Sequence, residues 1–230
     1  MLREGPRVTA GTLDLPLPLQ PAPAATTLVI DSATDACSVA LFAGDTLIAG
    51  DYRVLGRGHA EALVPMIAAL PERGQASRIA VALGPGSFTG VRVGLAAARA
   101  LALAWGSDLV GYPTLALVAA MARNTEGGQA VGVAMTGGHG EWFIEGFGSN
   151  GASCRPLTSR APGAAAIETV EHIVAGNQAE ALVAARGTGR ALPLWPDARA
   201  FSLLAADVLT VDAQPLYGRA PDAKLPLGAS

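Results

Sequence analysis

The residues with the clearest chemical potential form a glycine-rich string, Gly84–Gly94, which reads GPGSFTGVRVG. It follows an apolar run, Ile79–Leu83, and precedes a long Ala/Leu stretch, a pattern that predicts a strand, a tight turn and a helix. A helix start of this kind has free backbone N–H groups and the positive end of the helix dipole, which together bind anions. Ser87, Thr89 and Arg92 add two hydroxyls and a guanidinium. The string is also compatible with a plain strand-to-helix turn, so both interpretations stay open.

A second candidate group, Asp31, Ser32 and Thr34, follows the apolar run Thr27–Ile30. A carboxylate binds hard cations such as Mg²⁺, and hydroxyls with turn N–H groups bind phosphate. The alternative is an Asx-type turn in which the side chain caps its own backbone. The candidate cofactor-binding residues are therefore Asp31, Ser32, Thr34, Ser87, Thr89 and Arg92.

Other site chemistries find little support in the sequence. The glycine string lacks the Gly-Lys-Ser/Thr of a P-loop, has the wrong spacing for a dinucleotide fingerprint, and contains no G-x-S-x-G elbow. The histidines His59, His139 and His172 are isolated, so no metal site is predicted. Cys37 and Cys154 form neither a disulfide framework nor a metal-ligand spacing, which favours two reduced thiols.

The elements that must position these groups form a repeated pattern. A three-stranded antiparallel meander is predicted first, followed by alternating helices and strands: strands at 27–31, 37–42, 46–52, 79–83 and 109–112, and helices at 59–70, 90–105 and 113–123. The pattern then begins again in weaker form, with a hairpin of 130–135 and 141–147, a helix at 164–174, a strand at 181–185 and a helix at 202–209. This order predicts an α/β protein with two lobes and a mixed sheet in each.

Composition sets the domain organisation and excludes some partners. We expect a disordered Pro-rich leader (1–25), a first lobe (26–123), a smaller and divergent second lobe (124–213) and a tail (214–230). Half of the 230 residues are hydrophobic, 15% are charged, and the net charge is −3. This balance favours a globular protein and disfavours autonomous nucleic-acid binding. No run reaches the ~18 apolar residues of a membrane helix, so no membrane partner is predicted.

The helix at 90–105 is apolar almost all round, so more than one of its faces must be covered. Its small residues permit close helix approach. We expect one face on the sheet and another on a second chain, shared with the helix at 59–70. The predicted partner-binding residues are Leu63, Ile67, Leu95, Ala98, Leu101 and Ala102.

Three segments, Leu28–Leu41, His59–Leu70 and Gly84–Leu95, closely resemble the TsaB (YeaZ) family of bacteria, and GPGSFTGVR is highly specific to it. The resemblance is strong over 26–123 and weak over the second lobe. It returns at Pro215–Asp222, which is similar to a family ending with Gly218 in place of Leu. A family run, Asp-Ala-Arg-x-x-Glu-Val-Tyr, is reduced here to Glu141 and an aromatic, which puts any role of that Asp/Arg pair in doubt.

The resemblance implies a fold of the actin/Hsp70/sugar-kinase (ribonuclease H-like) superfamily and a cytoplasmic role in forming threonylcarbamoyladenosine at position 37 of tRNAs that read A-starting codons. It also implies a non-catalytic scaffold that pairs with the transferase TsaD, works with the ATPase TsaE, and forms a homodimer in isolation. The chain would have no cofactor of its own, ATP or ADP would sit at the TsaD interface, and tRNA would contact it only indirectly. The competing hypothesis is an ATP-using phosphotransferase of the same superfamily. It requires glycine-rich turns in the second lobe, for which 136–140 and 186–190 are the candidates.

Overall fold

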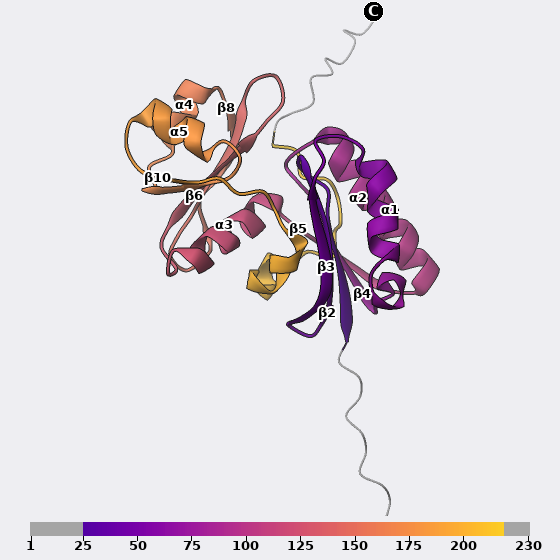
Figure 1. Ribbon diagram of the computed structural model, residues 1–230. Helices are drawn as coiled ribbons and strands as arrows, with labels where there is room; N and C mark the ends of the chain where they lie inside the picture. Colours follow the sequence, from indigo (N-terminus) through magenta and orange to yellow (C-terminus); the bar gives the residue numbers. More distant parts are fainter. Residues whose placement is uncertain (1–24, 219–230) are drawn as a thin grey trace, which may run out of the picture.

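The computed structural model describes residues 25–218, which form two five-stranded mixed sheets with helices packed against them (Figure 1). The first sheet has the order β3-β2-β1-β4-β5, with an antiparallel β1–β3 meander and with β4 and β5 parallel to β1. Its strands are β1 (Thr26–Asp31), β2 (Ala36–Ala43), β3 (Thr46–Val54), β4 (Arg78–Ala82) and β5 (Asp108–Tyr112). These strands agree with the predicted ones to within a few residues.

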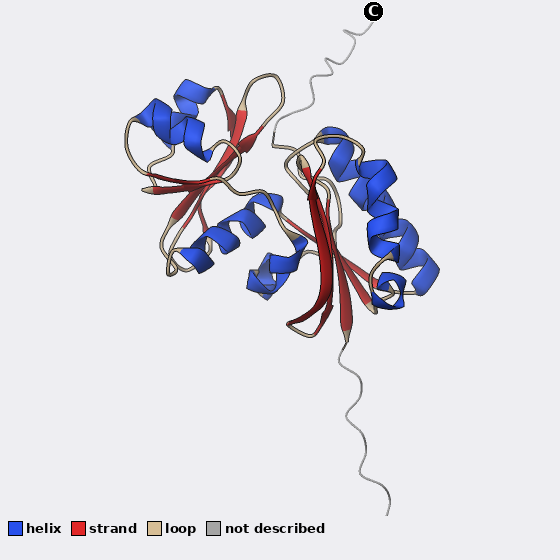
Figure 2. Ribbon diagram, in the orientation of Figure 1, coloured by secondary structure: helices blue, strands red, loops and turns tan. Residues whose placement is uncertain are grey.

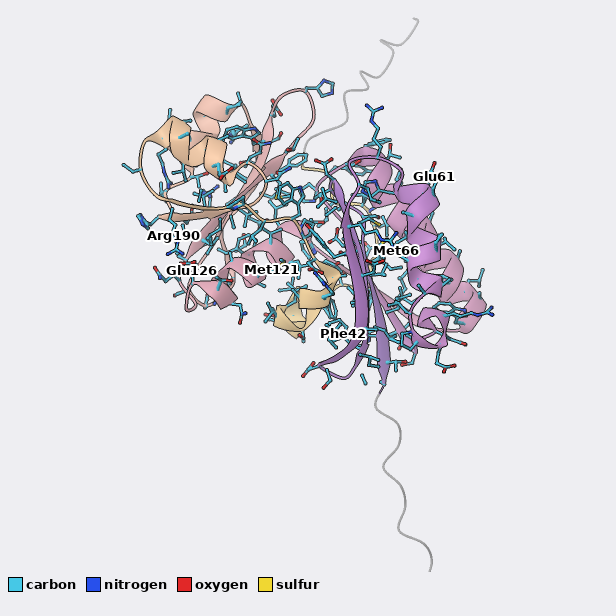
Figure 3. The ribbon with its side chains drawn as sticks, in the orientation of Figure 1. Phe42, Glu61, Met66, Met121, Glu126 and Arg190 are labelled. Carbon is cyan, nitrogen blue, oxygen red and sulfur yellow. The ribbon has the colours of Figure 1, made fainter. Side chains whose placement is uncertain are left out.

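Both faces of the first sheet are covered, which is why β2 is buried along almost its whole length. The helices α1 (His59–Ala68) and α2 (Phe88–Trp105) lie side by side on one face, and the short 3-10 helix η2 (Ala198–Leu203) lies on the other (Figure 1). Met66 of α1 and Phe42 of β2 are both in this core (Figure 3). A further 3-10 turn, η1 (Pro71–Gly74), follows α1, which ends before the predicted Leu70 because Pro71 follows.

The second sheet repeats the order of the first, with a meander followed by two strands parallel to its first strand. The order is β10-β9-β6-β7-β8. Helix α3 covers the face toward the first lobe, and α4 and α5 lie on the other face (Figure 2). The elements are α3 (Thr114–Thr125), β6 (Val131–Thr136), β7 (Trp142–Phe147), β8 (Ser153–Arg160), α4 (Pro162–Glu168), β9 (Ile173–Ala175), α5 (Ala179–Arg186) and β10 (Arg190–Leu192). The predicted two-lobed α/β architecture with a mixed sheet in each lobe is therefore confirmed.

Several predicted elements of the second lobe are wrong. The helix expected at 164–174 ends at Glu168, and the buried strand β9 begins at Ile173, inside the predicted range. The strand expected at 181–185 is helix α5. The helix expected at 202–209 is replaced by two 3-10 turns, η2 and η3 (Ala206–Val208), and the strands β8 and β10 were not predicted. The periodicity of a short apolar run does not separate helix from strand, so tertiary packing decides between them.

The observed lobes do not match the expected boundaries at residues 123 and 213 for two segments of the chain. Helix α3 contributes Val118 to the second core and Leu117 to the first. Residues 198–213 pack on the first sheet, where the Ala198 N–H donates to Ser38 Oγ at 2.9 Å. At the far end of α3, Glu126 pairs with Arg190 of β10 at 3.0 Å (Figure 3). The predicted leader lies outside the described residues, apart from Ala25.

By length and apolar composition alone, α2 is the one helix among the described residues that qualifies as a candidate membrane span. It packs on the first sheet, and only 28% of its residues are buried inside the structure. An apolar helix that packs on a sheet and has a largely uncovered outer side is also what a partner-binding element looks like.

Candidate functional site: a pocket between the lobes

A pocket of about 650 Å³ lies between the two lobes. The first lobe lines it with the β1–β2 turn and the β4–α2 loop. The second lobe lines it with the β6–β7 turn and the start of the β9–α5 loop, and the segment Pro215–Gly218 completes the wall. Its size and its mix of apolar walls with a few polar groups are those of a small-molecule site.

Asp31 does not reach this pocket, contrary to the predicted role in holding phosphate or Mg²⁺. Its carboxylate is fully buried, accepting the Ala33 N–H at Oδ1 and the Tyr112 hydroxyl at Oδ2, both at 3.1 Å. Burial raises the pKa of this carboxyl to about 7, although the hydrogen bonds from Ala33 and Tyr112 oppose that rise. The structure therefore places Asp31 in the self-capping turn that was the alternative interpretation.

The glycine string packs directly onto the β1–β2 turn. A Cβ on Gly86 would lie 2.0 Å from the Ala33 carbonyl oxygen, and one on Gly90 would lie 2.1 Å from the Ser32 carbonyl oxygen. Ser32, only 2% exposed, donates its hydroxyl to the Gly90 carbonyl at 2.9 Å and does not line the pocket. These glycines are needed for close backbone approach within the lobe.

The start of α2 is hydrogen-bonded internally. Ser87 is the N-cap, and its Oγ accepts the Gly90 N–H at 3.2 Å. The Ser87 N–H donates to the Ala33 carbonyl at 2.6 Å, and the Val91 N–H donates to the Ser87 carbonyl at 3.0 Å. The predicted phosphate cradle is thus largely occupied by the turn itself.

The remaining predicted binding residues divide between pocket and surface. Thr34 lines the pocket, and its Oγ1 accepts the Ala36 N–H at 3.2 Å. Ser87 and Arg92 also line it, whereas Thr89 is exposed and does not. Three of the six predicted residues, Thr34, Ser87 and Arg92, therefore meet at one wall of the pocket.

Arg92 connects α2 to the C-terminal segment. Its guanidinium donates to the Phe88 carbonyl at 3.1 Å and to the Tyr217 hydroxyl at 2.7 Å. It also lies 3.3 Å from the centre of the Phe88 ring and 5.5 Å from that of Tyr217. In the same segment, the Leu216 N–H donates to the Leu83 carbonyl at 2.8 Å.

The second-lobe wall holds residues that sequence reasoning missed. Asn177 accepts the Thr136 N–H at Oδ1 and donates from Nδ2 to Thr136 Oγ1, both at 2.9 Å, and Gln178 donates to the same Oγ1 at 2.8 Å. Gly176 precedes them with φ of 114°. Of the two glycine-rich turns that the sequence offered as ligand-binding candidates in the second lobe, 136–140 lines the pocket and 186–190 does not. The glycine-containing turn between strand β9 and helix α5 lines the pocket where the turn at 186–190 was expected to do so.

Most of the predicted partner-binding residues are core residues. Leu63, Ile67, Leu95 and Ala98 are at most 3% exposed, so the prediction is wrong for their side chains, which face the lobe interior. Leu101 and Ala102 are partly exposed. The outward stripe of α2 runs instead through Phe88, the half-buried Arg92, Ala96, Ala100 and Leu103, beside the exposed Arg99 and Ala104. That of α1 runs through Ala60, Val64 and Ala68, beside the exposed Glu61 and Pro65.

Within residues 25–218, no group of three or more His, Cys, Asp or Glu side chains is arranged to hold a metal ion. The two cysteines are both free thiols, with Cys37 buried and Cys154 exposed. Burial raises the pKa of Cys37 to about 11.

Comparison with known proteins finds relatives that are named for tRNA modification. The protein-family model for TsaD, tRNA N6-adenosine threonylcarbamoyltransferase, matches residues 53–189. The curated TsaB of Escherichia coli K12 is 35% identical over 121 residues, and that of Bacillus subtilis 168 is 33% identical over 109 residues. Both bear the name tRNA threonylcarbamoyladenosine biosynthesis protein TsaB. The match to the E. coli protein covers 50% of this chain and 52% of that relative, and the match to the B. subtilis protein covers 44% and 47%. The chain therefore spans about half the length of the curated relatives it matches.

Solved structures match over a larger part of the chain. YeaZ from Pseudomonas aeruginosa has a TM-score of 0.68 at 24% identity, covering 84% of this chain and 99% of its own. A second P. aeruginosa structure, described as similar to peptidase YEAZ, has a TM-score of 0.70 at 26% identity, covering 85% and 100%. Together with the two mixed sheets, these likenesses support the two-lobed fold of the actin/Hsp70/sugar-kinase type.

Proposed function

We propose, because the chain belongs to the TsaB (YeaZ) family, that it is a non-catalytic partner subunit of the transferase TsaD in the synthesis of threonylcarbamoyladenosine in tRNA. The observation that carries the partner role is the outer side of α2. This helix is apolar, yet its outward stripe is uncovered, with Phe88 68% exposed and Leu103 88% exposed. Val64, 59% exposed, adds an apolar side chain on the neighbouring helix α1.

Small residues make this surface suitable for another helix. Ala96 and Ala100 separate Phe88 from Leu103 on α2, and Ala60 and Ala68 flank Val64 on α1. Short side chains let two helix backbones approach closely, and the larger apolar ones supply buried area. We infer a helical partner with a matching apolar face, for which TsaD is the candidate and a second copy of this chain is the alternative.

The non-catalytic part of the proposal is supported by how the candidate groups are used. Asp31 is committed to Tyr112 and to its own turn, and Ser87 is committed to capping α2. This arrangement does not favour the phosphotransferase hypothesis, which relied on Asp31 to hold phosphate or metal. From the family resemblance we further propose that TsaE joins the complex, that ATP or ADP binds at the TsaD interface, that tRNA contacts this subunit only indirectly, and that the complex is cytoplasmic.

The partner role predicts that Leu103→Arg abolishes co-purification with TsaD. An arginine buried without a partner in an apolar interface costs about 2 kcal/mol or more, which weakens binding roughly thirtyfold. Since Leu103 is highly exposed in the free chain, the thermal unfolding midpoint should change little. The measurement is a pull-down with tagged TsaD, quantified by titration calorimetry.

Ile167→Arg is the matched control, because Ile167 is 82% exposed on α4 of the other lobe. It should bind TsaD as the unaltered chain does. Normal binding by the folded Leu103→Arg chain would contradict the proposed surface. If Leu103→Arg instead converts a dimer of this chain to monomers and leaves TsaD binding intact, the surface pairs copies of the chain and the TsaD role of α2 is wrong.

A further inference from the structure

We propose that the pocket between the lobes binds a small organic monocarboxylate with a flat apolar body. The apolar part of the site is made by Val91 and Phe88 of the first lobe, Met135 and Phe143 of the second, and Leu216 of the C-terminal segment. Its volume of about 650 Å³ falls within the range of roughly 300–1,000 Å³ typical of small-ligand sites. Phe88 and Arg92 line this pocket and also belong to the outward stripe of α2, whereas Leu103, which tests the partner role, does not line the pocket.

Arg92 supplies the anion-binding group. Its guanidinium has five N–H donors. It donates hydrogen bonds to two neutral oxygens, the Phe88 carbonyl and the Tyr217 hydroxyl. In the part of the chain that the structure describes, no carboxylate lies within ion-pair distance of Arg92. A half-buried guanidinium without a counter-ion, flanked by two aromatic rings, is suited to a planar carboxylate that accepts two parallel hydrogen bonds.

The charges around the pocket favour a carboxylate over a phosphate ester. The N–H groups of Ser87, Gly90 and Val91 already donate within the turn, so only those of Phe88 and Thr89 in the first turn of α2 are available to a ligand. Asp35, an acidic residue in the lining, disfavours a second negative charge. One arginine therefore balances a monoanion better than a dianion.

Polar groups across the pocket can fix the orientation of such a ligand. Thr136 and Asn177 lie on the second-lobe wall and are held rigidly by their mutual hydrogen bonds. Thr34 lies on the first-lobe wall, near the capping residue Ser87 in the lining. A ligand with its carboxylate at Arg92 and its apolar body between Phe88 and Phe143 would bridge both lobes.

The test uses two probes that differ only in charge, N-acetyl-L-phenylalanine and its primary amide. Binding to the full-length chain is measured by ligand-detected NMR and by the shift of the thermal unfolding midpoint. We expect saturable binding of the acid, and binding of the amide at least about tenfold weaker, because a charge-assisted pair is lost. Arg92→Gln should remove this preference, whereas Tyr217→Phe, which keeps the guanidinium but loses its hydrogen bond to the tyrosine, should retain it.

Equal binding of acid and amide, no binding of either, or an acid preference that survives in Arg92→Gln would overturn the proposal. AMP serves as the phosphate-bearing probe, and tighter binding of AMP than of the acid would replace the carboxylate assignment with a phosphate one. Because these measurements use the isolated chain without TsaD, their failure leaves the partner role untouched, and loss of TsaD binding in Leu103→Arg leaves this site untouched.

Discussion

Asp31→Asn is expected to stabilise the protein above pH 7 by up to about 4 kcal/mol. The unfolded chain loses this proton near pH 3.8, whereas the folded chain keeps it until about pH 7. Between these values the folded state binds more protons than the unfolded state. The stability associated with this carboxyl is therefore complete below pH 3.8 and is lost as the pH rises through 7.

The asparagine can keep the hydrogen bonds that the carboxyl makes. Its Oδ1 can accept the Ala33 N–H, and its Nδ2 can donate to the Tyr112 hydroxyl. That hydroxyl also lies 3.3 Å from the Ile30 carbonyl, to which it can then donate its own proton. The second Nδ2 hydrogen gains no partner from these groups, and an unpaired buried donor costs about 1–3 kcal/mol, so part of the gain from removing the buried charge is retained.

Urea unfolding of both proteins at pH 5 and pH 8 provides the measurement. The unaltered chain should lose stability between these pH values, and Asp31→Asn should lose much less. Asp45→Asn, at an exposed turn position, is the control for a change of charge alone. If Asp31→Asn loses as much stability as the unaltered chain between pH 5 and pH 8, the buried carboxyl is not the cause.

Gly86→Ala is expected to destabilise the first lobe by about 3 kcal/mol or more, because the added methyl group overlaps the backbone of the β1–β2 turn. The new Cβ would lie 2.0 Å from the Ala33 carbonyl oxygen and 2.9 Å from its carbonyl carbon. Backbone atoms cannot rotate away as a flexible side chain can, so the turn itself must shift. That shift would break the 2.6 Å hydrogen bond from the Ser87 N–H to Ala33.

Gly163→Ala is the matched control for this substitution. A Cβ at Gly163 meets nothing within 4 Å, and the residue lies in helix α4. Alanine there should be neutral or stabilise by about 0.4–1 kcal/mol, since it reduces the freedom of the unfolded chain. Thermal unfolding followed by circular dichroism compares the two. A Gly86→Ala chain as stable as the Gly163→Ala chain would show that the turn can move at little cost.

The first lobe was predictable because its signals are long and consistent. Uninterrupted apolar runs such as Ile79–Leu83 become buried parallel strands, and glycine pairs at Gly84 and Gly86 mark the turn that follows. The predicted strands and helices of this lobe all appear near their expected positions.

The second lobe was less predictable because its elements are short and rich in alanine. Ala181–Ala185 is a short apolar run whose periodicity does not separate strand from helix, and its alanines, which favour a helix, agree with its place in α5. Because β9 and α5 were not predicted as a strand and a helix, Asn177, which lies between them, was not predicted as a site residue. The order Ile173–Ala175, then Gly176, then an Ala/Leu run was the available signal for a strand, a turn and a helix.

Helical spacing predicted partner residues on α1 and α2, but it does not show which side of each helix faces outward. Leu63 of α1 and Leu95 of α2 are apolar, and so are the exposed residues Val64 of α1 and Leu103 of α2. A helix that is apolar on all sides has no polar face to mark the solvent side. Only the position of the sheet shows that Leu63 and Leu95 point inward.

The return of residues 198–218 to the first sheet has a consequence for the order of synthesis. The first lobe is built from an early segment, 26–112, and a late one, whereas the second sheet, 131–192, is continuous in sequence. The ribosome therefore releases a complete second sheet before the first lobe has received Ala198, Phe201 and Leu216. Chains commonly complete their N-terminal unit first, but this chain must complete its N-terminal lobe last. Until then, the face of β2 that η2 covers stays open to solvent or to a chaperone.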